Sequence, residues 1–164
     1  KGLQDLLQAI VELPCELRVC GTGTYETEIR AMVGKLDLCQ DVSFLGKIDQ
    51  EMLYKEYKDA RLVVMPSLIF ESFGNVGIEA MSHGRPVVAY DAGGVREWLR
   101  DGVTGYLVPR GRRDLLRERI SELLNDPILV KRMALAARQV CEQEFNRDVY
   151  KERLLRLYNT VLSS

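Results

Sequence analysis

The sequence lacks an excess of charge of either sign. It holds 23 Lys and Arg residues against 24 Asp and Glu residues, a formal net charge of −1 in 164 residues. A protein that binds nucleic acid through its phosphates needs a surplus of basic residues. The composition therefore argues against a general nucleic-acid binder, and no nucleic-acid partner is expected.

Long apolar runs are missing as well. No stretch approaches the length that crosses a bilayer, and the N-terminus has no basic start followed by an apolar block. These absences predict a cytoplasmic protein without a membrane span or a signal peptide. The first residue is Lys1 rather than Met, so we expect the chain to be either a fragment or a processed form of a longer protein.

The sequence also lacks metal-binding patterns. Its four cysteines form no C-x-x-C pair, and His83 is the single histidine. This set does not make a zinc site. Cys20 and Cys141 lie in apolar patterns, which predicts buried, reduced thiols and fits a reducing cytosol.

What the chain does contain is an alternation of short apolar strands and helices. Hydrophobic residues make up 46% of it, enough for a core, and its length is that of one domain. The expected strands are 17–20, 42–45, 62–65, 86–90 and 106–108. The expected helices are 3 to about 14, 28–36, 50–58, 75–82, 114–124, 127–140 and 146–162, with a short helix carrying Glu97 and Trp98 after Gly93-Gly94. This order predicts an α/β fold: a doubly wound, Rossmann-like parallel sheet with helices on both faces, in a single domain over 1–164.

The segment from Pro66 to Met81 is the most informative part of the chain. It places Glu71 and Glu79 eight positions apart, around a Ser-Phe-Gly turn that opens a helix. Helix-start N–H groups attract phosphate, Gly74 lets the backbone approach it, and carboxylates accept hydrogen bonds from sugar hydroxyls. The segment predicts a site for a ligand with both a phosphate and a sugar, helped by a cation such as Lys1. The alternative is a helix with two ordinary surface glutamates.

A second glycine-rich turn follows the strand at 17–20. Gly21 and Gly23 resemble the start of a dinucleotide fingerprint, but Glu26 stands where the third glycine is expected. The signal alone is weak. A phosphate or sugar loop and a plain turn both remain open.

Taken in order, these motifs resemble the C-terminal half of a retaining glycosyltransferase of family 4, the "group 1" enzymes with the GT-B fold. The resemblance runs from Lys1 to Tyr158. Its motifs are Lys1-Gly2, Gly21-Thr22-Gly23, Val42-x-Phe44-Leu45-Gly46, Pro66-Ser67, the E-to-E segment, Gly84-x-Pro86-Val87-Val88, Gly93-Gly94-x-x-Glu97, Asp101-Gly102-x-Thr104-Gly105 and Phe145. Ser72 departs from the family pattern, in which glycine is frequent at this position.

The resemblance implies a donor-binding domain for a nucleotide-diphosphate sugar. By family analogy Glu71 binds hydroxyls of the transferred sugar, as the catalytic candidate, and Glu79 holds the ribose hydroxyls. Lys1 would neutralise the diphosphate, and the backbone at Phe73, Gly74 and Asn75 would contact sugar and phosphate. The remaining donor-binding residues, near the base, would be Gly21, Gly23, Lys47 and Ile48. The family requires no metal or other cofactor.

The same resemblance implies that essential parts of the enzyme lie outside this chain. The family's acceptor domain, with a catalytic histidine, precedes this region, as does the first strand of this domain. We therefore expect a hexosyltransferase-type enzyme at full length, with this fragment binding the donor but not catalysing transfer. The alternative is a non-catalytic nucleotide-sugar binding module. A nucleotide-sugar epimerase is disfavoured by the E-to-E segment, and a nicotinamide-dependent oxidoreductase by the missing third glycine.

Two surface features remain to be placed. Five arginines interleaved with acidic residues favour a solvated helix face, with peripheral contact to an anionic membrane as the minority alternative: Arg110, Arg112, Arg113, Arg117 and Arg119. The last helix carries an apolar stripe made of Leu154, Leu155, Tyr158 and Leu162. Exposure of this stripe would favour self-association.

Overall fold

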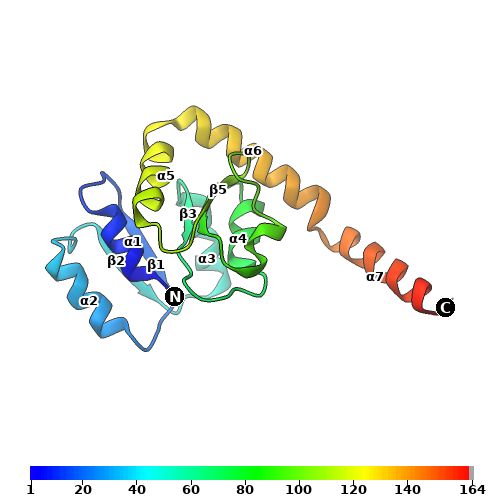
Figure 1. The fold of residues 1–164 in the computed structure, drawn as a ribbon, viewed down its shortest axis with the longest axis horizontal. Coiled ribbons are helices and arrows are strands. Elements are labelled where there is room, and N and C mark those ends of the chain that lie inside the picture. The colour runs from blue at the N-terminus through cyan, green and yellow to red at the C-terminus, as the bar shows by residue number, and fades with distance from the viewer. Residues whose placement is uncertain (163–164) are drawn as a thin grey trace.

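The computed structural model describes residues 1–162, and its strands lie between layers of helices (Figure 1). The elements are α1 (Leu3–Ile10), β1 (Leu17–Cys20), α2 (Glu26–Lys35), β2 (Val42–Gly46), α3 (Gln50–Asp59), β3 (Val63–Met65), α4 (Asn75–Ser82), β4 (Val87–Tyr90), η1 (Gly93–Glu97), β5 (Gly105–Val108), α5 (Arg113–Asn125), α6 (Pro127–Glu144) and α7 (Arg147–Leu162). Every expected strand and helix is present, with small shifts at the ends. The short helix η1 is a 3-10 helix that begins at Gly93 itself and ends before Trp98.

Local signals in the sequence explain several of these boundaries. Asp49 caps α3, since its side chain accepts a hydrogen bond from the N–H of Met52 at 2.8 Å. Asp126 caps α6 in the same way, and Pro127 occupies the first turn, where no N–H is needed. Gly84 follows α4 with φ of +68°, a conformation that ends the helix.

The parallel strands form two sheets rather than one continuous sheet. β1 pairs with β2, and the order in the second sheet is β3-β4-β5. Leu17 lies opposite Val42 in the first sheet, and Val87 lies between Val63 and Gly105 in the second. Within the described residues, β1 and β3 are not hydrogen-bonded to each other. The predicted class, parallel strands with helices on both faces, is confirmed, but the expected single sheet is divided.

A cavity of about 940 Å³ lies between β1 and β3. Both strands contribute to its walls, through Leu17, Arg18, Val19, Cys20, Val63, Val64 and Met65. The prediction of a buried Cys20 was wrong: among the residues that the structure describes, no strand pairs with β1 on this side, and the thiol is exposed. Cys141 is buried, as predicted, and all four cysteines are free.

The core lies on both faces of β4, which is buried along its whole length. Val88 and Tyr90 pack in one hydrophobic cluster with residues of α1 and α5, whereas Val87 and Ala89 pack in another with residues of α4. Successive side chains of a strand point to opposite faces, so one strand supports both helical layers. This arrangement places the loops after β3 and β4 side by side at the carboxyl edge of the sheet.

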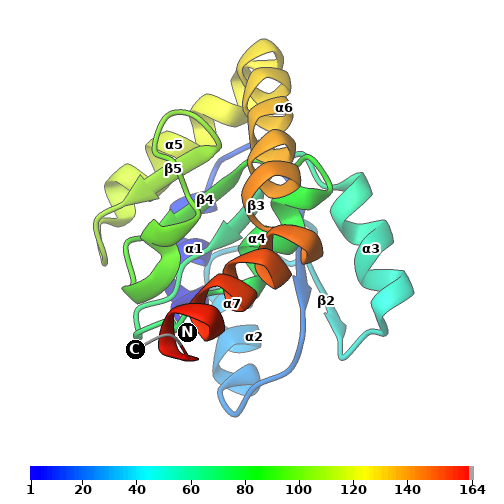
Figure 2. The ribbon, with the colours of Figure 1, turned by 90° about the vertical axis from the view of Figure 1, so that its right-hand side faces the viewer.

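Helix α7 leaves the body of the protein at the end of α6 (Figures 1 and 2). None of its residues is buried. The exposed fraction is 53% for Leu155 and 59% for Tyr158, which confirms that the apolar stripe is exposed. Self-association through it stays a prediction.

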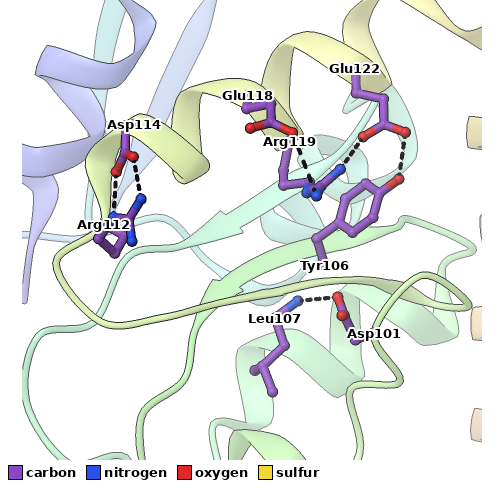
Figure 3. A network of polar contacts seen from close by, with 8 residues as sticks. All are labelled: Asp101, Tyr106, Leu107, Arg112, Asp114, Glu118, Arg119 and Glu122. Carbon is purple, nitrogen blue, oxygen red and sulfur yellow. Dashed lines mark hydrogen bonds and ion pairs between the residues drawn. The ribbon is translucent and has the colours of Figure 1, made fainter.

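Acidic side chains of α5 pair with Arg112 and Arg119 (Figure 3). Arg112 contacts Asp114 at 2.6 Å, and Arg119 contacts Glu122 at 2.8 Å. Glu122 also accepts a hydrogen bond from the hydroxyl of Tyr106 at 2.7 Å. These pairs agree with a solvated helix face at Arg112 and Arg119, whereas Arg117 donates to the carbonyl of Ala9 at 3.1 Å in a part-buried contact. Contact with a membrane surface stays a prediction. Among residues 1–162, no helix is both long enough and apolar enough to cross a bilayer.

Candidate functional site

The candidate site forms where the chain turns from β3 into α4. Gly74 is the N-cap of α4, with φ of +82°, in the left-handed region that favours glycine. A Cβ at this position would lie 3.0 Å from Cε of Met65. The N–H groups of Gly74, Asn75 and Val76 donate to no acceptor among the described residues. The start of α4 therefore offers unpaired amides and the positive end of a helix dipole to an anion.

Glu71 lies just before this helix start and is held by two groups. Its Oε1 accepts a hydrogen bond from Oγ of Ser67 at 2.6 Å and lies 3.6 Å from Nζ of Lys1. The chain start is fixed on the end of β3, since a Cβ on Gly2 would lie 1.8 Å from the carbonyl oxygen of Pro66. The structure thus brings together the predicted cation and the predicted catalytic carboxylate.

Glu79 lies one turn further along α4 and is held from another helix. Its Oε2 accepts a hydrogen bond from the hydroxyl of Tyr57 at 3.2 Å. Burial, followed by the charge of Glu79, raises the pKa of Tyr57, so that the hydroxyl remains a neutral donor. The ring of Tyr57 stacks on His83, with centroids 5.3 Å apart.

The two carboxylates do not line one common cavity. Glu71 lines the cavity between β1 and β3, together with Lys1 and Gly74. Glu79 lines a second cavity of about 630 Å³ between the start of α4 and the start of α7. Phe73 and Asn75 line both cavities. The glutamates therefore flank the same helix start from two sides.

The remaining predicted residues lie in the loops after β1 and β2. The N–H of Gly21 donates to the carbonyl of Gly46 at 2.7 Å, which brings the two loops together. Gly21, Gly23 and Lys47 are exposed and Ile48 is half-buried. None of these four residues lines either cavity. They form a neighbouring pair of loops rather than part of the walls around Glu71 and Glu79.

Sequence reasoning missed three residues that hold this site. Ser67 supports Glu71, Tyr57 supports Glu79, and Nε1 of Trp98 donates to the carbonyl of Phe73 at 2.5 Å. Ser67 carried a usable signal in the sequence, because it lies only four positions before Glu71. In the structure 6% of its surface is exposed. Trp98 packs in the core, at 1% exposure, and no sequence pattern pointed to its hydrogen bond.

No cluster of three or more His, Cys, Asp or Glu side chains positioned to hold a metal ion occurs in the described part of the chain. Lys1, Glu71 and Glu79 lie around the start of α4. Their chemistry is that of hydrogen bonding and charge neutralisation.

The chain is similar in sequence and in fold to known proteins of one family. Residues 1–140 match the family described as glycosyl transferases group 1. A phosphatidyl-myo-inositol mannosyltransferase of Mycobacterium leprae is 32% identical over 169 residues, covering 100% of this chain and 44% of that protein. The sucrose-phosphate synthase structure from Thermosynechococcus elongatus superposes with a TM-score of 0.90 at 30% identity, over 99% of this chain and 43% of that one.

A further structure, Anabaena Alr3699/HepE in complex with UDP and glucose, superposes with a TM-score of 0.89 at 27% identity, over 98% of this chain and 45% of that one. These likenesses confirm the predicted fold class. The chain spans less than half the length of these relatives. Because the family match covers most of its residues, the chain belongs to the glycosyl transferases group 1 family.

Proposed function

We propose that the chain is the donor-binding domain of a retaining glycosyltransferase, which holds a nucleotide-diphosphate sugar at the start of α4. One observation carries the proposal: Lys1, Glu71 and the unpaired amides of Gly74 to Val76 meet at the carboxyl end of β3. Ligands of parallel α/β sheets bind at this edge. The likeness to a structure that holds UDP and glucose supports the same ligand class.

The roles of the residues follow from their charges. The amides and Lys1 attract the diphosphate, whose negative charge grows as the bond to the sugar breaks, and this stabilisation needs no metal. Ser67 occupies Oε1 of Glu71, so Oε2 remains for hydroxyls of the transferred sugar. Glu79, on the other side of the helix start, accepts from the ribose hydroxyls. The loops with Gly21, Gly23, Lys47 and Ile48 border the base.

We also propose that the cavity between β1 and β3 takes an extended strand from polypeptide that precedes Lys1, with the acceptor domain further upstream. Both facing strand edges are unpaired among the described residues, and Lys1 and Gly2 lie at the carboxyl end of β3, where a parallel strand in this cavity would end.

The exposed apolar stripe of α7 would then contact the acceptor domain. Catalysis, in a cytoplasmic enzyme, requires that domain, so the chain alone binds the donor without transferring sugar.

The test compares a nucleoside diphosphate with the corresponding nucleotide sugar in calorimetric titrations. In the 164-residue chain, Glu79→Ala should lower the affinity for both ligands about tenfold, because both contain the ribose. Glu71→Ala should remove only the extra affinity of the nucleotide sugar. Glu51→Ala is the control, since this glutamate lies on the exposed surface of α3.

Two outcomes would contradict the proposal. The first is binding that neither substitution changes. The second is robust turnover of a nucleotide sugar by the 164-residue chain, which would show that no acceptor domain is needed. Binding without turnover by the full-length protein would instead indicate a non-catalytic nucleotide-sugar module.

A further inference from the structure

The loop between Glu71 and Gly74 is anchored from behind by the segment that follows β4. The N–H of Gly94 donates to the carbonyl of Glu71 at 2.8 Å, and Nε1 of Trp98 donates to the carbonyl of Phe73 at 2.5 Å. Two alternate carbonyl groups of the loop therefore point toward the same segment. The contact is close, since a Cβ on Gly94 would lie 2.2 Å from the carbonyl oxygen of Ser72.

The direction of these carbonyls fixes the direction of the amides. No peptide bond within residues 1–162 is cis, and in a planar trans peptide the N–H points opposite to the C=O of the same unit. Hydrogen bonds from Gly94 and Trp98 thus turn the N–H groups of Ser72 and Gly74 away from η1. Both residues line the cavity that contains Glu71.

The indole of Trp98 is seated against α4 with little room to move. Its exposed fraction is 1%, and a Cβ on Gly77 would lie 2.0 Å from its Cη2 atom. A Cβ on Gly74 would lie 3.5 Å from its Cζ2 atom. The absence of side chains at positions 74 and 77 lets the ring lie directly beneath the helix start, with its N–H aimed at the Phe73 carbonyl.

We propose that Trp98 is a positioning residue, whose N–H holds the Phe73–Gly74 peptide so that the Gly74 amide faces the donor's diphosphate. The inference rests on the proposed function, because it needs a diphosphate at this site. An amide held in place donates a charge-assisted hydrogen bond to an anion. Were the peptide to turn over, the Phe73 oxygen would face the anion instead and repel it.

The test removes one N–H and keeps the shape of the ring. Trp98 is the single tryptophan of the sequence, so replacing tryptophan during expression alters this position alone. The sulfur isostere 3-benzothienylalanine lacks the N–H, and 4-fluorotryptophan, incorporated in the same way, keeps it. Affinities for UDP and GDP are measured by calorimetry, and the affinity for the uncharged nucleoside is measured by NMR titration.

With the isostere, we expect nucleoside diphosphates to bind about fivefold to tenfold more weakly, as for the loss of one hydrogen bond. Nucleoside binding should be unchanged, and the fluorinated control should bind both as the unmodified chain does. A mere packing role for Trp98 would change both affinities together or neither, and either result would overturn the inference alone. An unmodified chain that binds neither UDP nor GDP would overturn the proposed function and the inference with it.

Discussion

The hydroxyl of Tyr57 donates a hydrogen bond to Oε2 of Glu79 at 3.2 Å, although the two residues are 22 positions apart in the chain. Only 4% of the surface of Tyr57 is exposed, so its ring is fixed between α3 and α4. A fixed donor holds the carboxylate in one orientation. Glu79 therefore reaches the proposed ribose with one oxygen already occupied and one oxygen available.

The first prediction concerns selectivity for the ribose. Tyr57→Phe keeps the ring but frees the Glu79 carboxylate, so the preference for UDP over 2′-deoxy-UDP should fall about fivefold. The ratio of the two dissociation constants is the measurement. Tyr54→Phe is the matched control, because Tyr54 also lies beside His83 but its hydroxyl accepts from Gln50. A ratio that stays at the wild-type value in Tyr57→Phe would contradict the role of Tyr57.

The second prediction concerns the sugar side of the site. Ser67→Ala removes the hydrogen bond to Oε1 of Glu71 and leaves this carboxylate free to rotate toward Lys1. We expect the extra affinity of a nucleotide sugar over its nucleoside diphosphate to fall about threefold to tenfold. Affinity for the nucleoside diphosphate itself should change little. Equal losses for the two ligands would show that Ser67 acts on the whole loop instead.

The third prediction concerns packing beneath the helix start. Gly77→Ala places a methyl group 2.0 Å from Cη2 of Trp98, so overpacking should lower the free energy of unfolding by about 1–3 kcal/mol. Gly34→Ala is the control, since this glycine lies in α2 with open space around its Cβ position, and alanine should raise stability there by about 0.5–1 kcal/mol. Urea unfolding of the wild type and of both variants measures each change in the free energy of unfolding. If Gly77→Ala has the same free energy of unfolding as the wild type, the indole moves aside without cost.

The fourth prediction concerns pH and the contacts drawn in Figure 3. The Tyr106 hydroxyl, and then Arg119, lower the pKa of Glu122 below its ordinary value of 4.5. The ionised Glu122 carboxylate therefore stabilises the folded state above pH 4.5, and this stabilisation is lost as the pH falls through the lowered pKa of the folded state. Burial, and then Glu122, raise the pKa of Tyr106 from 10.0 to about 12. The neutral hydroxyl therefore stabilises the folded state below pH 10, and this stabilisation is lost as the pH rises toward 12.

Removing the hydroxyl should abolish the alkaline dependence and weaken the acid dependence, because Arg119 still lowers the pKa of Glu122. Tyr106→Phe should lower the free energy of unfolding by about 1 kcal/mol at neutral pH. The difference from the wild type should shrink toward both ends of the pH range. Urea unfolding at a series of pH values gives the measurement. A difference that stays constant from acidic to alkaline pH would show that packing, rather than the hydrogen bond, accounts for the effect.

Much of the fold was predictable because its signals are local. Asp49 caps a helix that begins at the next residue, and the short apolar strands carry their own pattern. The same holds for Glu71, Gly74 and Glu79, which lie in one continuous segment around a helix start. Residues in one turn of chain are neighbours in any fold that forms the turn.

Other features depend on contacts between distant segments, and the sequence pattern did not reveal them. Trp98 is 25 positions from Phe73, and nothing in an apolar Trp-Leu pair indicates which carbonyl the indole will reach. Strand pairing is equally non-local. The apolar pattern of residues 17–20 predicted a strand correctly, but it did not show that one edge of that strand would be unpaired and leave Cys20 exposed.

The division of the sheet has a consequence for how the chain opens. No backbone ladder crosses from β1 to β3 in residues 1–162, so we expect the segment with β1, β2 and α2 to open separately from the rest, with which its side chains share one hydrophobic cluster. We expect the amide protons of β1 to exchange with solvent well before those of β4, which is paired on both sides. A strand inserted between the two units would join them, and local opening of β1 would then require global unfolding.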